Sequence, residues 1–394
     1  MLSVDTKHYN FYFDFLEKDA VPSLFYTSNS SSNSNFNKNS RYKDIFSKGL
    51  HVVSYMPSYF QFADSELPSH LSYIYSFRDF GFLINLEGYV NIQQYMKREL
   101  GSHRRQVLKR IKRLEVCFNP TYKLFYGTIS KEEYSALFDK MKGFLEERFL
   151  ERKEESSQLL RWHHYRDSVY DLIQQKRASI FVIYNGSVPI SISLNYHCED
   201  TMIHSLNSFD TRYSKFGLGN IAIFKLLEWC FQNKYSLFDF EWGDLAYKKK
   251  WANKQERYKI VIIYPNASIF YKVFARFKLA MYSLKDFVVK KRIQILEFLY
   301  KWHSKLFLVN LSQNKTNNDG YEFCGMDMLE SNYELIPIPI NYSKKEPLVK
   351  PVIDFQYLNS ETSSSIEIFG LNLYPDMYMI KGKEKMQWFR LYKG

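Results

Sequence analysis

Two carboxylates on one short apolar run are the side chains best placed to do chemistry in this chain. Residues 236–242 read Ser-Leu-Phe-Asp-Phe-Glu-Trp, so Asp239 and Glu241 alternate with two phenylalanines. Side chains two residues apart on a β-strand point to the same face, and the pattern therefore predicts that the carboxylates lie together. A carboxylate at a strand end can remove a proton from a bound acceptor. Glu241 is the candidate general base, and an ion pair of Glu241 with Lys248 or Arg104 is an equally good interpretation.

Other polar side chains accompany this strand. His204 lies on the strand predicted before it and could act as a base through a water, although a single histidine in a strand is more often structural. Asp239 is a candidate substrate ligand. Asp244 follows the strand and is expected mainly to cap the next helix, with substrate contact as the alternative.

Cationic and aromatic side chains further upstream are candidate acceptor ligands. Arg104 lies within the apolar arc of a helix predicted over 91–115, so it must snorkel, pair with a carboxylate or point into a cleft. Arg104 and Lys248 could bind phosphate groups of an acceptor. Trp162 and His163 are expected to line the acceptor site. Adjacent histidines on a helix point about 100° apart, so the pair at 163–164 does not predict a metal site.

A glycine-containing turn precedes a long apolar segment. Gly217 and Gly219 allow a backbone to approach a ligand closely, and the N–H groups of the helix that follows can bind an anion such as a pyrophosphate. The turn is not a dinucleotide fingerprint, because Ile223 replaces the third small residue, and it lacks the Gly-Lys-Ser/Thr of a Walker loop. The residues predicted to bind a phosphorylated co-substrate are Ser214, Lys215, Phe216, Gly217, Leu218, Gly219 and Asn220.

The elements around these residues follow from periodicity. From residue 180 to 264 the chain predicts the order β-β-β-α-β-α-β, with a hairpin at Asn185-Gly186. Helices are predicted over 91–115, from a capping box at Ser130 to about Arg152, and over 157–177. The Ser/Asn-rich run 28–40 is expected to be a surface loop. This pattern indicates an α/β (α+β) protein with a mostly antiparallel sheet flanked by helices.

These motifs together resemble the GNAT acyltransferase superfamily. The turn matches the last four positions of its Gln/Arg-x-x-Gly-x-Gly/Ala pattern, with Ser214 in the first position. A closer resemblance is to CelD-type acetyltransferases of cellulose and surface-polysaccharide synthesis. That resemblance rests on Tyr213-Ser214, Gly217, Asp239-Phe240, Gly243-Asp244, Tyr247-Lys248, Trp251 and a basic upstream helix, Arg104–Arg113.

The resemblance implies a fold, a donor and an acceptor. It implies a degenerate GNAT-like unit over 1–145 and a complete GNAT domain over 146–266, with basic amphipathic helices over 267–310 and an extension of unknown role over 311–394. It also implies acyl-CoA, typically acetyl-CoA, as co-substrate, Tyr247 as the acid that protonates the departing thiolate, and a transferase of groups other than aminoacyl. The implied acceptor is a nucleotide-linked amino sugar or a surface polysaccharide.

Composition limits the remaining possibilities. The 45% hydrophobic and 24% charged residues are typical of a globular protein, and the net charge of +12 favours an anionic partner such as CoA, a nucleotide, nucleic acid or an anionic membrane. We expect no DNA partner and no metal, because the four cysteines are scattered. We expect a cytoplasmic protein, with peripheral contact at the inner membrane surface through 267–310 as an alternative to packing of that segment on the domain. Two other functions stay open: a Fem-like transferase that uses aminoacyl-tRNA, and a non-catalytic GNAT-fold binding module.

Overall fold

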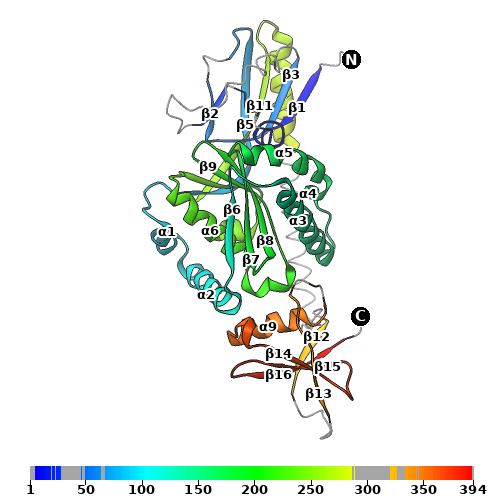
Figure 1. Cartoon of the computed structure of the whole chain (residues 1–394). Coiled ribbons are helices and arrows are strands. Elements are labelled where there is room, and N and C mark those ends of the chain that lie inside the picture. The colour runs from blue at the N-terminus through cyan, green and yellow to red at the C-terminus, as the bar shows by residue number, and fades with distance from the viewer. Residues whose placement is uncertain are drawn as a thin grey trace, which may run out of the picture.

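A nine-stranded mixed sheet organises the chain. The computed structural model describes residues 5–18, 20–22, 24–27, 46, 49–63, 67–285, 288, 320–325, 333–342, 344 and 346–392. The strand order is β1-β3-β11-β5-β10-β9-β8-β7-β6 (Figure 1). Only the pairs β1–β3 and β9–β10 are parallel, which confirms the predicted mostly antiparallel sheet. The strands are β1 (Thr6–Asn10), β3 (Leu50–Pro57), β5 (Leu71–Asn85), β6 (Thr121–Phe125), β7 (Ala178–Asn185), β8 (Val188–Cys198), β9 (Thr201–Phe209), β10 (Leu237–Trp242) and β11 (Lys254–Pro265).

The order of elements predicted for the middle of the chain is confirmed. Strands β7, β8 and β9 form a meander, and α6 (Leu218–Gln232) then connects β9 to its parallel neighbour β10. The short helix α7 (Ala246–Trp251) leads into β11. The β7–β8 hairpin turns at Gly186, whose φ of 59° is one that glycine adopts without strain.

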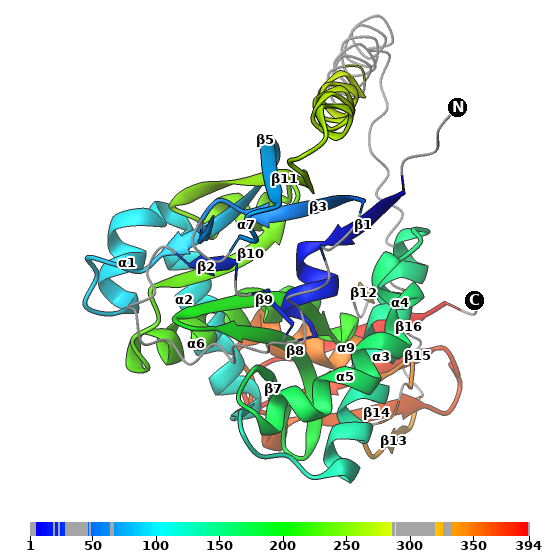
Figure 2. The same cartoon turned by 90° about the horizontal axis from the view of Figure 1, so that it is seen from above.

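Helices cover both faces of the sheet. One face carries α1 (Ile92–Glu99), α2 (Gly101–Phe118) and α6, and the other carries α3 (Lys131–Arg152) and α5 (Trp162–Gln174), with α4 (Ser157–Leu160) beside them (Figures 1 and 2). The Ser130 side chain accepts the Glu133 N–H at 3.1 Å, as the capping box predicted. The single helix predicted over 91–115 is instead two helices, because the chain turns at Gly101, where φ is +49°.

The N-terminal residues contribute to the same sheet. The long strand β5 pairs with both β10 and β11, so strands from the first 85 residues are interleaved with strands that follow residue 236. A π-helix, η1 (Phe11–Leu16), follows β1 and packs on the α5 side of the sheet. Strands β2 (Phe25–Thr27) and β4 (Phe60–Phe62) form a small separate ladder. The predicted loop 28–40 lies outside the described residues.

The C-terminal extension forms a second sheet. Its order is β12-β16-β15-β14-β13, and α9 packs between this sheet and the main body (Figure 1). The elements are β12 (Tyr321–Cys324), β13 (Leu335–Pro337), α9 (Val349–Asn359), η6 (Ser363–Ser365), β14 (Glu367–Leu371), β15 (Met377–Lys381) and β16 (Met386–Leu391). Before it, residues 269–285 form a helix, and most of the predicted helical segment after residue 285 lies outside the described range. In the part of the chain described, no helix is both long and apolar enough to cross a membrane.

Candidate functional site

The centre of the sheet separates where β9 and β10 diverge. Their parallel register runs from Leu237↔Thr201 to Asp239↔Ile203, after which β9 continues to Phe209 with no further pairing to β10. The separation begins at an irregularity in β10. There Asp239 Oδ1 accepts the Glu241 N–H at 2.7 Å, and Glu241 takes a left-handed conformation with φ of 61°. That conformation is strained for a residue other than glycine, and residues strained in this way concentrate at functional sites.

Glu241 carries an unsatisfied oxygen at this point. Its Oε1 is buried and has no hydrogen-bond partner among the described residues. Burial, followed by the nearby Glu17 carboxylate, raises the pKa of Glu241 to about 8, against the opposing influence of Lys248. A carboxylate with a pKa near the working pH can both take up and release a proton, as a general base requires.

Asp239 is held very differently, although it lies only two residues away. It is fully buried, and its Oδ2 accepts hydrogen bonds from Tyr12 Oη at 2.8 Å and Tyr59 Oη at 2.7 Å. Its Oδ1 accepts from Tyr258 Oη at 3.4 Å in addition to the Glu241 N–H. Burial raises the pKa of Asp239, and these hydrogen bonds oppose that rise. Asp239 therefore organises the strand end, and it has no exposed atom with which to bind a substrate.

Lys248 closes the irregular strand end. Its buried Nζ donates to the Trp242 carbonyl at 2.7 Å and to the Glu241 carbonyl at 3.3 Å. Burial lowers the pKa of Lys248, while the two carboxylates oppose this. The predicted link to Glu241 therefore runs through main-chain oxygens. On the same helix, Tyr247 is partly exposed, and burial followed by Glu241 raises its pKa to about 12, so its hydroxyl stays protonated.

His204 lies on β9 beside the point of divergence. Its Nδ1 lies 2.8 Å from Asn195 Oδ1, and its Nε2 lies 3.3 Å from Asn207 Nδ2. Burial and the Lys248 charge lower its pKa to about 3, so the imidazole is neutral and both nitrogens are engaged. These contacts favour a structural role. Arg148 from α3 donates to the Asn207 carbonyl at 2.8 Å and lies close enough to Tyr247 to influence its pKa.

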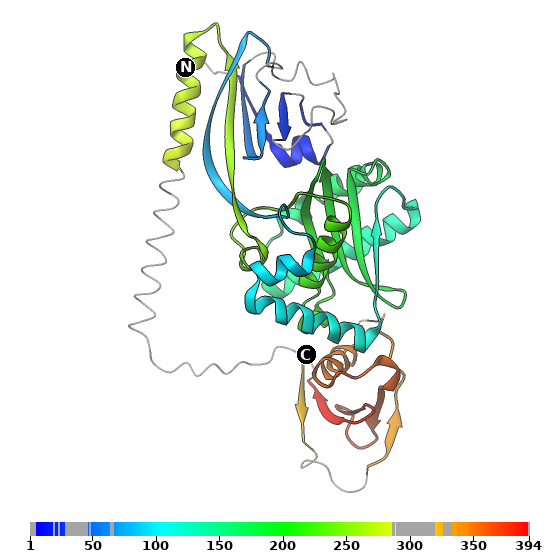
Figure 3. The same ribbon diagram turned by 90° about the vertical axis from the view of Figure 1, so that its left-hand side faces the viewer.

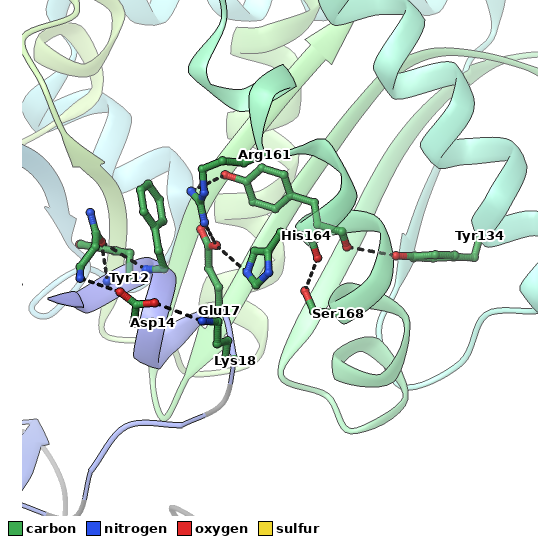
Figure 4. A network of polar contacts seen from close by, with 11 residues as sticks. Tyr12, Asp14, Glu17, Lys18, Tyr134, Arg161, His164 and Ser168 are labelled. Carbon is green, nitrogen blue, oxygen red and sulfur yellow. Dashed lines mark hydrogen bonds and ion pairs between the residues drawn. The ribbon is translucent and has the colours of Figure 1, made fainter. Parts of the chain in front are cut away.

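A second carboxylate reaches Glu241 from the N-terminal segment. Glu17 follows η1 and is buried, and its Oε2 accepts from Arg161 Nη2 at 2.8 Å while His164 Nε2 lies 3.6 Å away (Figure 4). Its Oε1 has no hydrogen-bond partner in the described structure. We call Glu17, Glu241, Tyr165 and Tyr196 the acid cluster, because burial and then the two carboxylates raise the pKa of both tyrosines. The Tyr196 hydroxyl also lacks a partner within the described residues.

The predicted acceptor residues on α5 separate into two groups. Trp162 is buried against Phe138, with a ring-centroid distance of 5.5 Å, and its indole nitrogen lacks a partner in the described part of the chain. His163 is exposed, and the next residue, His164, is the one that faces Glu17. Figure 4 shows the side chains of Glu17, Arg161 and His164 converging.

The glycine turn lies at the N-terminus of α6, as predicted. Residues Thr211–Phe216 form a 3₁₀ helix, and Gly217 follows with φ of 66°. The guanidinium of Arg110 lies over Gly217, since a Cβ at this glycine would be 2.8 Å from Arg110 Nη1. The N–H groups of Asn220 and Ile221 donate to the Gly217 carbonyl and close the first turn of the helix. The N–H groups of Leu218 and Gly219 precede that bonding.

Other side chains pack around this helix end. His103 packs edge-on against Trp251 at 5.6 Å, and burial, Lys250 and Arg110 together lower its pKa. Asn220 accepts the Trp251 indole N–H at 2.8 Å, which fixes α7 against α6. A helix N-terminus with nearby cations is suited to an anionic group.

The charged residues of the turn itself are already engaged. Lys215 Nζ lies 2.7 Å from Oδ2 of the buried Asp354 on α9, and Phe216 packs against Tyr357 at 4.9 Å. Arg212 binds Asp210 and donates to the carbonyls of Tyr342 and Lys344. Ser214 is exposed. The C-terminal extension therefore holds the outer side of the turn.

The other two predicted substrate ligands are Asp244 and Arg104. Asp244 is exposed and pairs with Lys249 at 2.5 Å, and the N-cap position of α7 is Leu245. Arg104 is half-buried on α2. Sequence reasoning missed Glu17, Arg110, Arg148 and His103. Only Arg110 carried a local signal, as part of the basic helix, because the others are recognised by contacts across long stretches of chain.

Two further observations concern metal binding and the position of a pocket. Within the described residues, no group of three or more His, Cys, Asp or Glu side chains could hold a metal ion. A shallow pocket of about 270 Å³ lies at the N-terminal end of β10, opposite to Glu241. It is lined mainly by 86–90 and 234–236 and contains none of the groups discussed above.

Comparison with known proteins supports a GNAT domain in the middle of the chain. Residues 101–249, from α2 into α7, match the family model described as an acetyltransferase (GNAT) domain. The match confirms the predicted resemblance to GNAT acyltransferases for this segment, while the CelD-type assignment stays a prediction. The matched segment excludes Glu17, β5 and the C-terminal sheet. No curated protein matches the chain.

Solved structures show distant similarity. A conserved protein of unknown function from Bacteroides thetaiotaomicron is 8% identical, with a TM-score of 0.37 over 54% of this chain and 69% of that one. L-PGS from Bacillus licheniformis is 12% identical, with a TM-score of 0.36 over 59% and 73%. FemX is 10% identical, with a TM-score of 0.36 over 50% and 64%. Similarity at this level does not establish a shared activity.

Proposed function

We propose that the protein transfers an acyl group from acyl-CoA, typically acetyl-CoA, to an amine or hydroxyl of a sugar. One observation carries the proposal. The strands β9 and β10 diverge between the N-terminus of α6 at Gly217 and the unsatisfied carboxylate of Glu241. The family match over 101–249 supports the reaction class.

Each group has a defined part in the proposed reaction. The N–H groups at the start of α6 and the Arg110 guanidinium bind the diphosphate of the donor. Glu241 removes a proton from the acceptor nucleophile, which attacks the thioester carbonyl and forms a tetrahedral intermediate. The C–S bond then breaks, and the thiolate takes a proton from Tyr247, whose raised pKa keeps it protonated until that step. The products are the acylated acceptor and CoA.

The acid cluster supports a sugar acceptor. Its free groups are two carboxylate oxygens and one tyrosine hydroxyl, on Glu17, Glu241 and Tyr196. Buried polar groups normally have hydrogen-bond partners, so these three atoms indicate a ligand rich in hydroxyl or amino groups. A nucleotide-linked amino sugar or a surface polysaccharide fits this description.

Calorimetry with CoA and acetyl-CoA is the first test. We expect binding by the wild type and weak or no binding by Gly217→Val, because a side chain there meets Arg110 and the backbone has positive φ. Absence of binding at millimolar ligand would remove the proposed donor. Turnover can then be followed as thiol release with a panel of amino sugars and nucleotide sugars.

One observation favours a second donor. Lys215 and Arg212 are engaged by the C-terminal extension and by Asp210, which leaves fewer cations at the turn for a diphosphate. A Fem-like transferase would take its acyl group from aminoacyl-tRNA, and the net charge of +12 suits an RNA partner. A steeply salt-dependent tRNA gel shift, together with no CoA heat signal, would favour this alternative. If neither donor binds, a non-catalytic binding module becomes the better interpretation.

A further inference from the structure

The helix at 269–285 presents an unusual outer side. Seven large apolar side chains on it and at residue 288 are exposed, among them Ile269 at 75%, Val273 at 60% and Phe277 at 59%. We call this set the outer face: Ile269, Phe270, Val273, Phe277, Met281, Leu284 and Val288. At about 100° per residue, these positions span an arc of roughly 120°. Figure 3 shows this helix, in yellow, lying along the outside of the long strands.

The helix already has a separate inner face. Ala275 is fully buried, and Tyr271, Phe274, Leu279 and Tyr282 pack with it against a small core of β3 and β11. The residues that fix the helix to the sheet are therefore not those of the outer face. Single exposed apolar residues are common on proteins, but a contiguous stripe indicates an interaction surface.

The charged side chains on the described helix are all of one sign. The described helix, residues 269–285, has four basic side chains and no acidic one, and one acidic residue, Asp286, follows directly in the sequence. Lys272 and Arg276 are exposed on one flank, and Lys285 and the half-buried Lys278 lie on the other. An apolar stripe between two basic flanks is the arrangement that lies in the interface of an anionic bilayer, with the apolar side chains among the acyl chains.

We propose that the outer face docks on an anionic lipid surface. A second copy of this chain is a poorer occupant, because two outer faces in contact would bring together eight basic side chains, four from each described helix. A straight helix of 17 residues, about 26 Å long, also presents a convex side that fits a plane without a matching groove. This inference does not depend on acyl transfer.

Vesicle flotation with the full chain tests the proposal. We expect binding to phosphatidylcholine vesicles that contain phosphatidylglycerol, and little binding to phosphatidylcholine alone. The pair Val273→Ser and Phe277→Ser should abolish binding, and Lys272→Gln or Arg276→Gln should each weaken it about fivefold. Val90→Ser is the matched control, because Val90 is 81% exposed elsewhere on the molecule and should have no effect.

Other outcomes would overturn it. Equal binding to both vesicle types, no binding, or binding that survives the Val273/Phe277 change would each exclude an anionic docking surface at this helix. A dimer in light scattering that is lost in Phe277→Ser, without vesicle binding, would assign the outer face to a second copy. Circular dichroism of each variant separates these results from failure to fold, and CoA calorimetry reports the proposed function independently.

Discussion

The glycine turn at 213–220 and the acid cluster differ in how their polar groups are satisfied. In and directly before the turn, the charged side chains are already paired: Lys215 with Asp354 and Arg212 with Asp210. In the acid cluster, Glu17, Glu241 and Tyr196 each have a buried oxygen without a partner in the described residues. We therefore infer that the unsatisfied groups of the acid cluster, rather than the paired charges of the turn, are the ones open to a ligand.

The two carboxylates of β10 show the same contrast at closer range. Asp239 accepts hydrogen bonds from three tyrosines and one main-chain N–H, whereas Glu241 has a strained backbone and a free oxygen. We infer that Asp239 stabilises the strand end and Glu241 performs the chemistry. Each of the following changes tests one side of this comparison.

Replacement of the free carboxylate should give the largest effect. Glu241→Gln keeps the size of the side chain and removes its basicity, so we expect acyl transfer to fall about 10²–10⁴-fold with donor affinity unchanged. Steady-state thiol release with an acceptor that the wild type uses would measure this. Asp244→Asn is the control, since Asp244 is exposed and paired with Lys249. A wild-type rate for Glu241→Gln would show that the base lies elsewhere.

Loss of the satisfied carboxylate, Asp239, should instead lower the free energy of unfolding. Asp239→Ala leaves the hydroxyls of Tyr12, Tyr59 and Tyr258 without their acceptor in a buried site. We expect a loss of about 3 kcal/mol in the free energy of unfolding, measured by urea denaturation. Asp244→Ala should change it by no more than about 0.5 kcal/mol. A folded and stable Asp239→Ala variant with no activity would reverse the roles we assign to the two carboxylates.

At the turn, Arg110 from α2 should contribute more to CoA affinity than Lys215, which belongs to the turn itself. Arg110→Ala removes the guanidinium over Gly217, and we expect the Kd for CoA to rise about tenfold. Lys215→Ala should change that Kd less than about twofold, because Lys215 is paired with Asp354. Calorimetry of both variants gives the comparison directly. A larger rise in Kd for Lys215→Ala than for Arg110→Ala would show that Lys215 binds the donor.

The last comparison concerns the pH dependence of stability. Because the folded state raises the pKa of Glu241 to about 8, its ionised form disfavours folding at alkaline pH, and that cost vanishes below the ordinary value near 4.5. Glu241→Gln should therefore gain stability over the wild type as pH rises from 5 to 8, by about 3 kcal/mol. Thermal unfolding at several pH values checks this. A difference between the two proteins that is independent of pH would place the raised pKa in doubt.

Local patterns predicted much of the scaffold and part of the site. Alternation in 236–242 placed Asp239 and Glu241 on a strand, and the glycine pair placed the turn at the start of α6. The same patterns carried no information on Glu17, which reaches Glu241 from more than 200 residues away in the chain. They also did not reveal that Lys215 is paired, since its partner Asp354 lies on α9 in the C-terminal extension. Such contacts depend on tertiary packing.

The interleaving of β5 with β10 and β11 has a consequence for synthesis of the protein. About 150 residues separate the end of β5 from the start of β10, so at ~5–20 residues per second the ribosome exposes β5 roughly 8–30 s before either neighbour exists. During that interval, a strand of 15 residues has open hydrogen-bonding edges. Expression yield should therefore depend strongly on temperature and on chaperones that bind nascent chains, independently of the stability of the finished fold.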